Sequence, residues 1–160
     1  MKLKTIAAAA ATTAIAVSGL NLAMAGPAAA AAGVWVPYGR INPITSSTNA
    51  TWVCGGTDPI AGTTGKVIAQ VCAVRSRTNR DRVQAAVIVK NDRSSLYATD
   101  AAAALWDVQT GRFVNRWECL RSGVAAHTWS VCFGETIPYS WNVYAQGGAN
   151  GTNLPPSLGV

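Results

Sequence analysis

The chain has 160 residues, of which 13 are lysine or arginine, 7 are aspartate or glutamate and one is histidine, so its formal net charge is +6. Charged residues are 12% of the sequence and hydrophobic residues 49%, which excludes an intrinsically disordered protein. The mild basicity permits an anionic partner but does not predict specific nucleic-acid binding, and four cysteines in a short chain favour disulfide bonds.

The N-terminus has the three parts of a secretory signal peptide. Two lysines give it a positive start, an Ala-rich apolar run follows, and Ala23-Met24-Ala25 is a small-x-small cleavage motif. Cleavage after Ala25 and after Ala32 both fit, and we favour Ala32 because Gly26-Pro27 ends the apolar run before the cleavage region. In composition the segment resembles the signals of exported actinomycete proteins, so a bacterial source is expected.

Removing a signal over 1–32 from 160 residues leaves 128 residues, 33–160, enough for one domain but not two. This part has 11 basic and 7 acidic side chains, a net charge of +4. We expect a secreted, extracellular monomer with no membrane span once the signal is removed. Its expected partner is a secreted protein or an anionic cell-wall polymer.

The first strands are predicted on either side of a turn. Residues 51–54 start the core, and the apolar run 67–74 is typical of a well-buried strand. The midpoint between Cys54 and Cys72 is residue 63, in a turn flanked by glycines. Folding the chain there sets the two cysteines opposite one another, so the sequence predicts a Cys54–Cys72 disulfide.

The middle of the chain continues the strand pattern. Residues 83–90 alternate as a half-buried strand, with the valines on one face. Asp100 precedes four alanines, which fits either the cap of one helical turn or a strand. Residues 105–114 predict a hairpin closed at Gly111; they resemble the Trp-Asp hairpin of β-propeller repeats, but occur once, so we interpret them as a hairpin alone.

The last third predicts a second disulfide, Cys119–Cys132, across a wide loop around residues 123–127. A final strand is expected over 139–144, ended by two glycines, with a loose tail after it. The fold class is therefore all-β: a small antiparallel β-sandwich or barrel of seven or eight strands with two disulfides. Each disulfide is expected to contribute about 3 kcal/mol. With one histidine and no Cys-x-x-Cys pair, neither a metal site nor a cofactor is expected.

Three acid–base residues are candidates for catalysis. His127 together with Glu118 or Glu135 is a possible catalytic set for a small secreted hydrolase. However, the sequence has no Gly-x-Ser-x-Gly nucleophile motif. We favour ordinary solvated side chains and lean towards a protein that is not an enzyme.

Arg121 and Ser122 suggest a second function. The stretch 119–122, Cys-Leu-Arg-Ser, is similar to the reactive loop of substrate-like serine-protease inhibitors. The resemblance implies that Arg121 enters the specificity pocket of the protease and that Ser122 follows the scissile bond. A loop held by the disulfide of Cys119 would be ordered before binding. The competing interpretation is a basic turn.

Two further groups of residues are candidates for binding. Four arginines in the connection 75–82 form a potential site for phosphate or an anionic polymer, although Asp81 interrupts them and a solvated turn is favoured. They are Arg75, Arg77, Arg80 and Arg82. Six tryptophans are either core residues, which we favour, or exposed stacking surfaces. They are Trp35, Trp52, Trp106, Trp117, Trp129 and Trp141.

The sequence thus predicts a secreted, disulfide-bonded, non-enzymatic protein that binds a partner outside the cell or at the cell envelope. A serine-protease inhibitor presenting Arg121 and a hydrolase using His127 are the alternatives.

Overall fold

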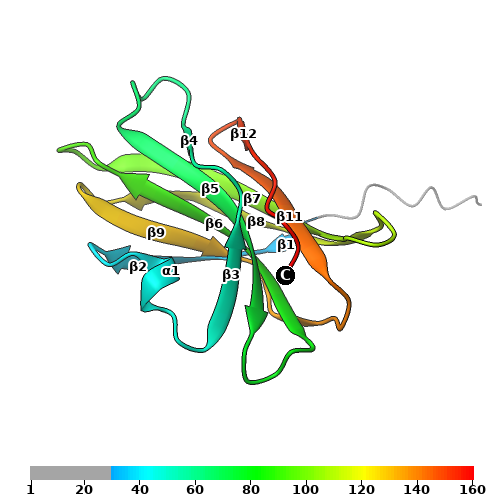
Figure 1. Cartoon of the computed structure of the whole chain (residues 1–160). Helices are drawn as coiled ribbons and strands as arrows, with labels where there is room; N and C mark the ends of the chain where they lie inside the picture. The colour runs from blue at the N-terminus through cyan, green and yellow to red at the C-terminus, as the bar shows by residue number, and fades with distance from the viewer. Residues whose placement is uncertain (1–29) are drawn as a thin grey trace, which may run out of the picture.

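The computed structural model describes residues 30–160, which form two stacked β-sheets (Figure 1). Sheet A has the order β1-β8-β7-β11-β12, and sheet B the order β2-β9-β6-β5-β3, with β4 paired to β5 and β10 to β6. The strands of sheet A are β1 (Ala31–Ala32), β8 (Phe113–Val124), β7 (Tyr97–Asp107), β11 (Val143–Ala149) and β12 (Thr152–Leu154). Those of sheet B are β2 (Val34–Gly39), β9 (Thr128–Phe133), β6 (Arg82–Asn91), β5 (Val67–Ser76), β3 (Ala50–Cys54), β4 (Asp58–Pro59) and β10 (Ile137–Pro138).

This architecture confirms the predicted all-β class and is the sandwich rather than the barrel. Residues 30–160 form twelve strands where seven or eight were expected, because short strands such as β1, β4 and β10 have no alternating pattern of their own. All described pairings are antiparallel except that of β1 with β8. The α1 helix (Pro43–Ser46) has four residues, and residues 30–160 contain no helix long and apolar enough to cross a membrane. Most of the predicted signal peptide lies outside the described residues.

The main core lies between the sheets, where alternate residues of each strand point inward. Val83, Val87 and Val89 of β6 are fully buried there, on the predicted face. Trp117 of β8 is the largest fully buried side chain. An added Cβ on Gly134 would lie 2.5 Å from the ring of Trp117, so the indole packs directly against the backbone of Gly134.

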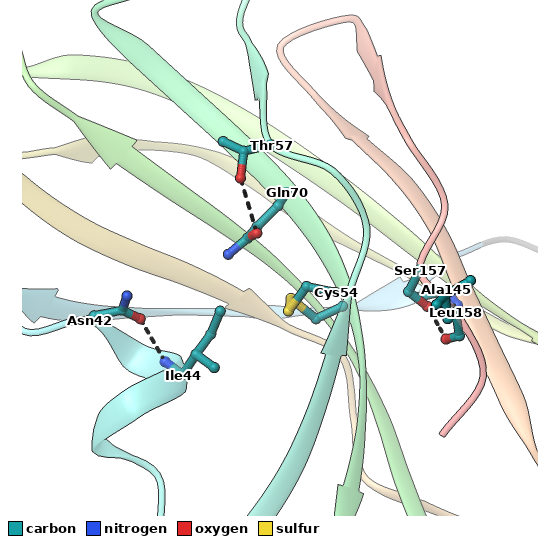
Figure 2. The surroundings of a disulfide bond; sticks show 9 residues. Asn42, Ile44, Cys54, Thr57, Gln70, Ala145, Ser157 and Leu158 are labelled. Carbon is teal, nitrogen blue, oxygen red and sulfur yellow. Dashed lines mark hydrogen bonds between the residues drawn. A yellow bond between two sulfur atoms is a disulfide. The ribbon is translucent and has the colours of Figure 1, made fainter.

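The outer face of sheet B is covered by a second apolar cluster, so the prediction that β6 is only half-buried is wrong. Ala86 and Ile88, expected to face solvent, are buried with Val131 beneath Tyr38, Ile44 and Trp52. The covering segment runs from β2 through α1 to β3, where Asn42 caps the helix by accepting a 2.9 Å hydrogen bond from the amide of Ile44 (Figure 2). A local alternation cannot show that a distant segment folds over a strand.

Both predicted disulfides are present: one lies within sheet B, and the other joins the two sheets. Cys54 and Cys72 are register partners in β3 and β5, with their Cα atoms 4.0 Å apart. The Cys119–Cys132 bond joins β8 of sheet A to β9 of sheet B, with a Cα separation of 5.9 Å. The predicted wide loop is instead a short turn over 125–127, because β8 continues to Val124 and β9 begins at Thr128. Across this turn the chain passes from sheet A to sheet B.

The C-terminal segment differs from the prediction in two ways. The last long strand is β11, which begins at Val143 rather than at residue 139 and continues through Gly147 and Gly148 instead of ending there. An added Cβ on Gly147 would lie 2.4 Å from the carbonyl oxygen of Ala102. The tail is also docked rather than loose. The Ser157 hydroxyl oxygen accepts a 2.8 Å hydrogen bond from the amide of Ala145 (Figure 2), and the Val160 amide donates to the Val143 carbonyl.

The position of β1 leads to a prediction about processing. Ala31 and Ala32 pair with Trp117 and Glu118, and the Gly33 amide donates a 2.8 Å hydrogen bond to the Glu118 carbonyl. Cleavage after Ala32, which the sequence favours, would remove this strand. We therefore expect the mature chain to begin at Gly26, the other compatible site. Intact-mass analysis and N-terminal sequencing of secreted protein will measure this; a chain beginning at Gly33 would contradict it.

Candidate binding groove

A groove of about 920 Å³ lies on the outer face of sheet A. This volume is at the upper end of the range for small-molecule sites. Side chains and backbone of β7, β8, β11, β12 and the turns beside them form its lining. The lining residues are Asp100, Ala102, Ala103, Ala104, Trp106, Phe113, Arg116, Gln146, Gly147, Gly148, Asn150, Gly151, Thr152, Asn153, Leu154 and Pro156.

The floor of the groove consists of small residues on the two central strands. Ala102 and Ala104 of β7 alternate with the buried Ala103 and Leu105, so they face outward. In the neighbouring strand, Gly148 is the register partner of Ala102. Because none of the floor residues extends beyond a methyl group, the centre of the sheet lies lower than its borders.

Polar side chains form the two long borders. On β8, Arg116 and Glu118 are the register partners of Ala104 and Ala102, and they form an ion pair of 2.5 Å. On the other side, Gln146 is the register partner of Ala104 in β11, and Asn153 lies in β12. The side-chain amides of Gln146 and Asn153 are exposed and form no hydrogen bond with another described residue.

One end of the groove is aromatic. Trp106 and Phe113 are register partners, with ring centroids 5.4 Å apart in an edge-to-face arrangement. Phe113 is 48% exposed. The indole nitrogen of Trp106 is enclosed and has no hydrogen-bond acceptor among residues 30–160. The indole nitrogens of Trp52 and Trp117, outside the groove, are in the same state, so this property is not specific to the groove.

Asp107, next to Trp106, holds this end of the sheet together. Its carboxylate accepts hydrogen bonds from the amides of Gln109 and Thr110 and a 2.7 Å bond from the Tyr139 hydroxyl. The backbone hydrogen bond from Thr110, followed by that from Tyr139, lowers the pKa of Asp107 below its ordinary value. Asp107 therefore acts as an ionised acceptor that closes the predicted β7–β8 hairpin.

The four predicted binding arginines are not equivalent. The guanidinium of Arg75 donates to the carbonyl oxygens of Arg80, Tyr139 (3.1 Å), Trp141 (2.6 Å) and Val160 (3.1 Å). Burial lowers the pKa of Arg75, and the charge of Asp81 acts in the opposite direction. Arg75 thus joins the β5–β6 connection to the C-terminal segment, and its donors are occupied by the protein itself.

The other three arginines are exposed. Arg77 donates to the Thr51 hydroxyl and the Thr48 carbonyl, both at 3.3 Å. Arg82 lines a second, smaller hollow of about 370 Å³ on the other sheet, together with residues including Gln84. Anion binding by these arginines stays a prediction, which rests on Arg77, Arg80 and Arg82 rather than on all four.

Arg121 and Ser122 lie within a strand. Both belong to β8, where Ser122 is the register partner of Thr99, and Arg121 donates a 3.2 Å hydrogen bond to the Ala98 carbonyl. Both are exposed. The inhibitor hypothesis stays a prediction, and it now requires a protease to bind a strand residue rather than a loop.

The three candidate catalytic residues lie in separate places. His127 is in the turn before β9, and Glu135 lies beyond the other end of that strand, whose six residues span about 20 Å. Glu118 lies on β8 and is paired with Arg116. Residues 30–160 also contain no cluster of three His, Cys, Asp or Glu side chains placed to hold a metal. The hydrolase hypothesis stays a prediction, and no contact between these side chains supports it.

The tryptophans divide between core and surface. Trp117 is buried, Trp141 is 59% exposed, and Trp35 donates a 2.8 Å hydrogen bond to the Leu120 carbonyl. Trp52 packs on Phe133, and Lys90 lies 5.4 Å from the ring of Trp129. Trp106 is the tryptophan that lines the groove.

No protein-family model, curated protein or solved structure matches the chain. Sequence reasoning did not find the groove, although one signal was present. The run 101–104 is four consecutive alanines before Leu105 and Trp106. In a strand, such a run leaves one face of the sheet without large side chains, which is where a groove forms.

Proposed function

We propose that this protein is a non-enzymatic binding protein that acts outside the cell, at the cell envelope, and that its ligand lies in the groove of sheet A. The observation that carries the proposal is the groove itself: a wide hollow over small residues, with an aromatic end and polar borders. Binding sites combine apolar surface with a few convergent polar groups in this way. The two disulfides are consistent with an oxidising compartment.

The chemistry of the lining favours binding over catalysis. Its ionisable side chains are Asp100 and Arg116, and the others are amides, aromatic rings, alanines and glycines, one threonine, one leucine and one proline. No histidine, cysteine or serine is among the lining residues, so the groove lacks the Ser–His and Cys–His pairs that serve most often in nucleophilic catalysis.

Filling the floor of the groove tests the proposal. We expect the Ala104→Tyr variant to lose at least tenfold in affinity for purified bacterial cell walls, because the phenol ring occupies the space above the floor; tenfold corresponds to about 1.4 kcal/mol. Co-sedimentation of the secreted protein with the walls measures the affinity.

The matched control is Leu120→Tyr, which also adds a phenol ring to sheet A. Leu120 is 85% exposed and lies outside the groove lining, so this variant is expected to bind like the wild type. Unchanged binding by Ala104→Tyr, or equal loss in both variants, would argue against a ligand in the groove.

A further inference from the structure

We infer that the groove of sheet A binds an uncharged glycan chain, with a sugar ring against Trp106 and Phe113. This inference rests on the proposed function and specifies its ligand. Four properties of the groove support it: its charge, the kind of hydrogen-bonding groups at its borders, the aromatic end, and its position on a sheet face.

The charge of the lining matches a neutral ligand. Arg116 is the cationic side chain of the lining, and it is already paired with Glu118 at 2.5 Å. Asp100 adds a negative charge at the far end. A polyanion would therefore meet no net positive field in the groove, although the chain as a whole is basic. This separates the groove from the exposed arginines of residues 75–82, to which the predicted anionic polymer would bind.

The borders carry groups suited to hydroxyls. An amide side chain offers one acceptor oxygen and two donor hydrogens, and a sugar hydroxyl both donates and accepts. Gln146 and Asn153 present free amides on one border, while Asp100 presents a carboxylate at one end. The groove therefore offers both hydrogen-bond donors and hydrogen-bond acceptors, which fits a ligand that has hydroxyls along its length.

The aromatic end supplies the apolar part of the contact. A pyranose ring has a face of C–H groups, which packs on the negative face of an aromatic ring. Phe113 is 48% exposed and therefore available for such packing. Trp106 packs edge-to-face against Phe113 and also lines the groove, so the two rings together offer the apolar surface.

The position on a face argues against an extended peptide. Peptides that join a sheet gain main-chain hydrogen bonds at an unpaired edge. The floor strand β7 is paired on both sides, with β8 and with β11, so its backbone groups are already used. Over this floor a ligand is therefore recognised through side chains, which suits a glycan better than a peptide that adds a strand; β12, at the border, is the lining strand with an unpaired edge.

Native affinity electrophoresis tests the inference. The wild type runs in gels that contain hydroxyethyl cellulose, galactomannan, xylan or dextran, and in gels that contain polygalacturonate as the anionic probe. We expect at least one neutral polysaccharide to retard the protein, with little change when salt is added, because no ion pair with the ligand is involved. We expect Gln146→Ala and Asn153→Ala to weaken that retardation at least fivefold.

Gln109→Ala is the matched control, because Gln109 is an exposed amide of the β7–β8 turn outside the groove lining, and it should behave like the wild type. The inference is overturned if no neutral polysaccharide retards the protein, or if only polygalacturonate does so. In that case, loss of cell-wall binding by Ala104→Tyr would still support the proposed groove. Retention of cell-wall binding by that variant would instead remove the groove function and the glycan together.

Discussion

The Trp117→Ala variant is expected to lose about 3–5 kcal/mol of unfolding free energy, the usual cost of deleting a large buried aromatic side chain. Trp117 is fully buried between the sheets, two residues before Cys119 of the inter-sheet disulfide. Its ring lies against the backbone at Gly134, which the disulfide and β9 hold in place. Because the surroundings cannot collapse into the space, we expect a cavity to remain.

Urea unfolding of the oxidised protein, followed by circular dichroism, measures this loss. The matched control is Trp141→Ala, since Trp141 is 59% exposed and a surface substitution usually changes stability by less than about 0.5 kcal/mol. Typical domains have only about 5–15 kcal/mol of stability, so a loss of this size is a large fraction of the total and should lower the urea midpoint clearly. Equal losses in the two variants would show that Trp117 is not the centre of the core.

The second large effect is expected at Arg75, because its guanidinium binds four backbone carbonyls. Two of these bonds, to Tyr139 and Val160, are partly buried, and charge-assisted hydrogen bonds contribute about 1.5 kcal/mol or more each. The bonds to Arg80 and Trp141 are exposed, so water replaces them at little cost. Arg75→Ala should therefore lose about 3 kcal/mol.

The same urea experiment measures the Arg75 effect, and hydrogen exchange adds a local measurement. Protection of the Val143 and Val160 amides should fall in Arg75→Ala, because both belong to the C-terminal segment that Arg75 holds. Arg75→Lys should recover only part of the loss, since a lysine lacks the planar fork that reaches several carbonyls. Arg77→Ala, whose bonds are exposed, is the matched control and should lose less than 1 kcal/mol. A loss of that same small size in Arg75→Ala would contradict the role given to Arg75.

Local patterns in the sequence were sufficient for the strands whose partners are close in the chain. The register of Cys54 with Cys72 follows from a turn between them, and the hairpin at Gly111 follows from local turn chemistry. The Cys119–Cys132 pairing was also predicted, but the sequence did not show that this bond joins the two sheets. An alternating pattern gives the face of a side chain, not the sheet that a strand joins.

The features that the sequence did not predict all depend on contacts between segments that are distant in the chain. Ile88 is buried because the segment before β3 covers it, and Gly147 continues a strand because the backbone of Ala102 lies against it. The groove was missed for the same reason. Its borders, Arg116 and Gln146, face each other across Ala104 only once β8 and β11 lie on either side of β7.

The crossing of the chain at Gly33 has a consequence for behaviour at high concentration. There the chain passes from β1, at the border of one sheet, to β2, at the border of the other. Pro37 lies within β2, and the Trp35 indole covers the Leu120 carbonyl at the neighbouring border. Between Trp117 and Leu120 the outer carbonyls of β8 therefore already have partners, so a second molecule cannot add a strand across this stretch without displacing β1. This stretch of the border is thus protected against intermolecular strand addition, the step that leads to fibrous aggregates.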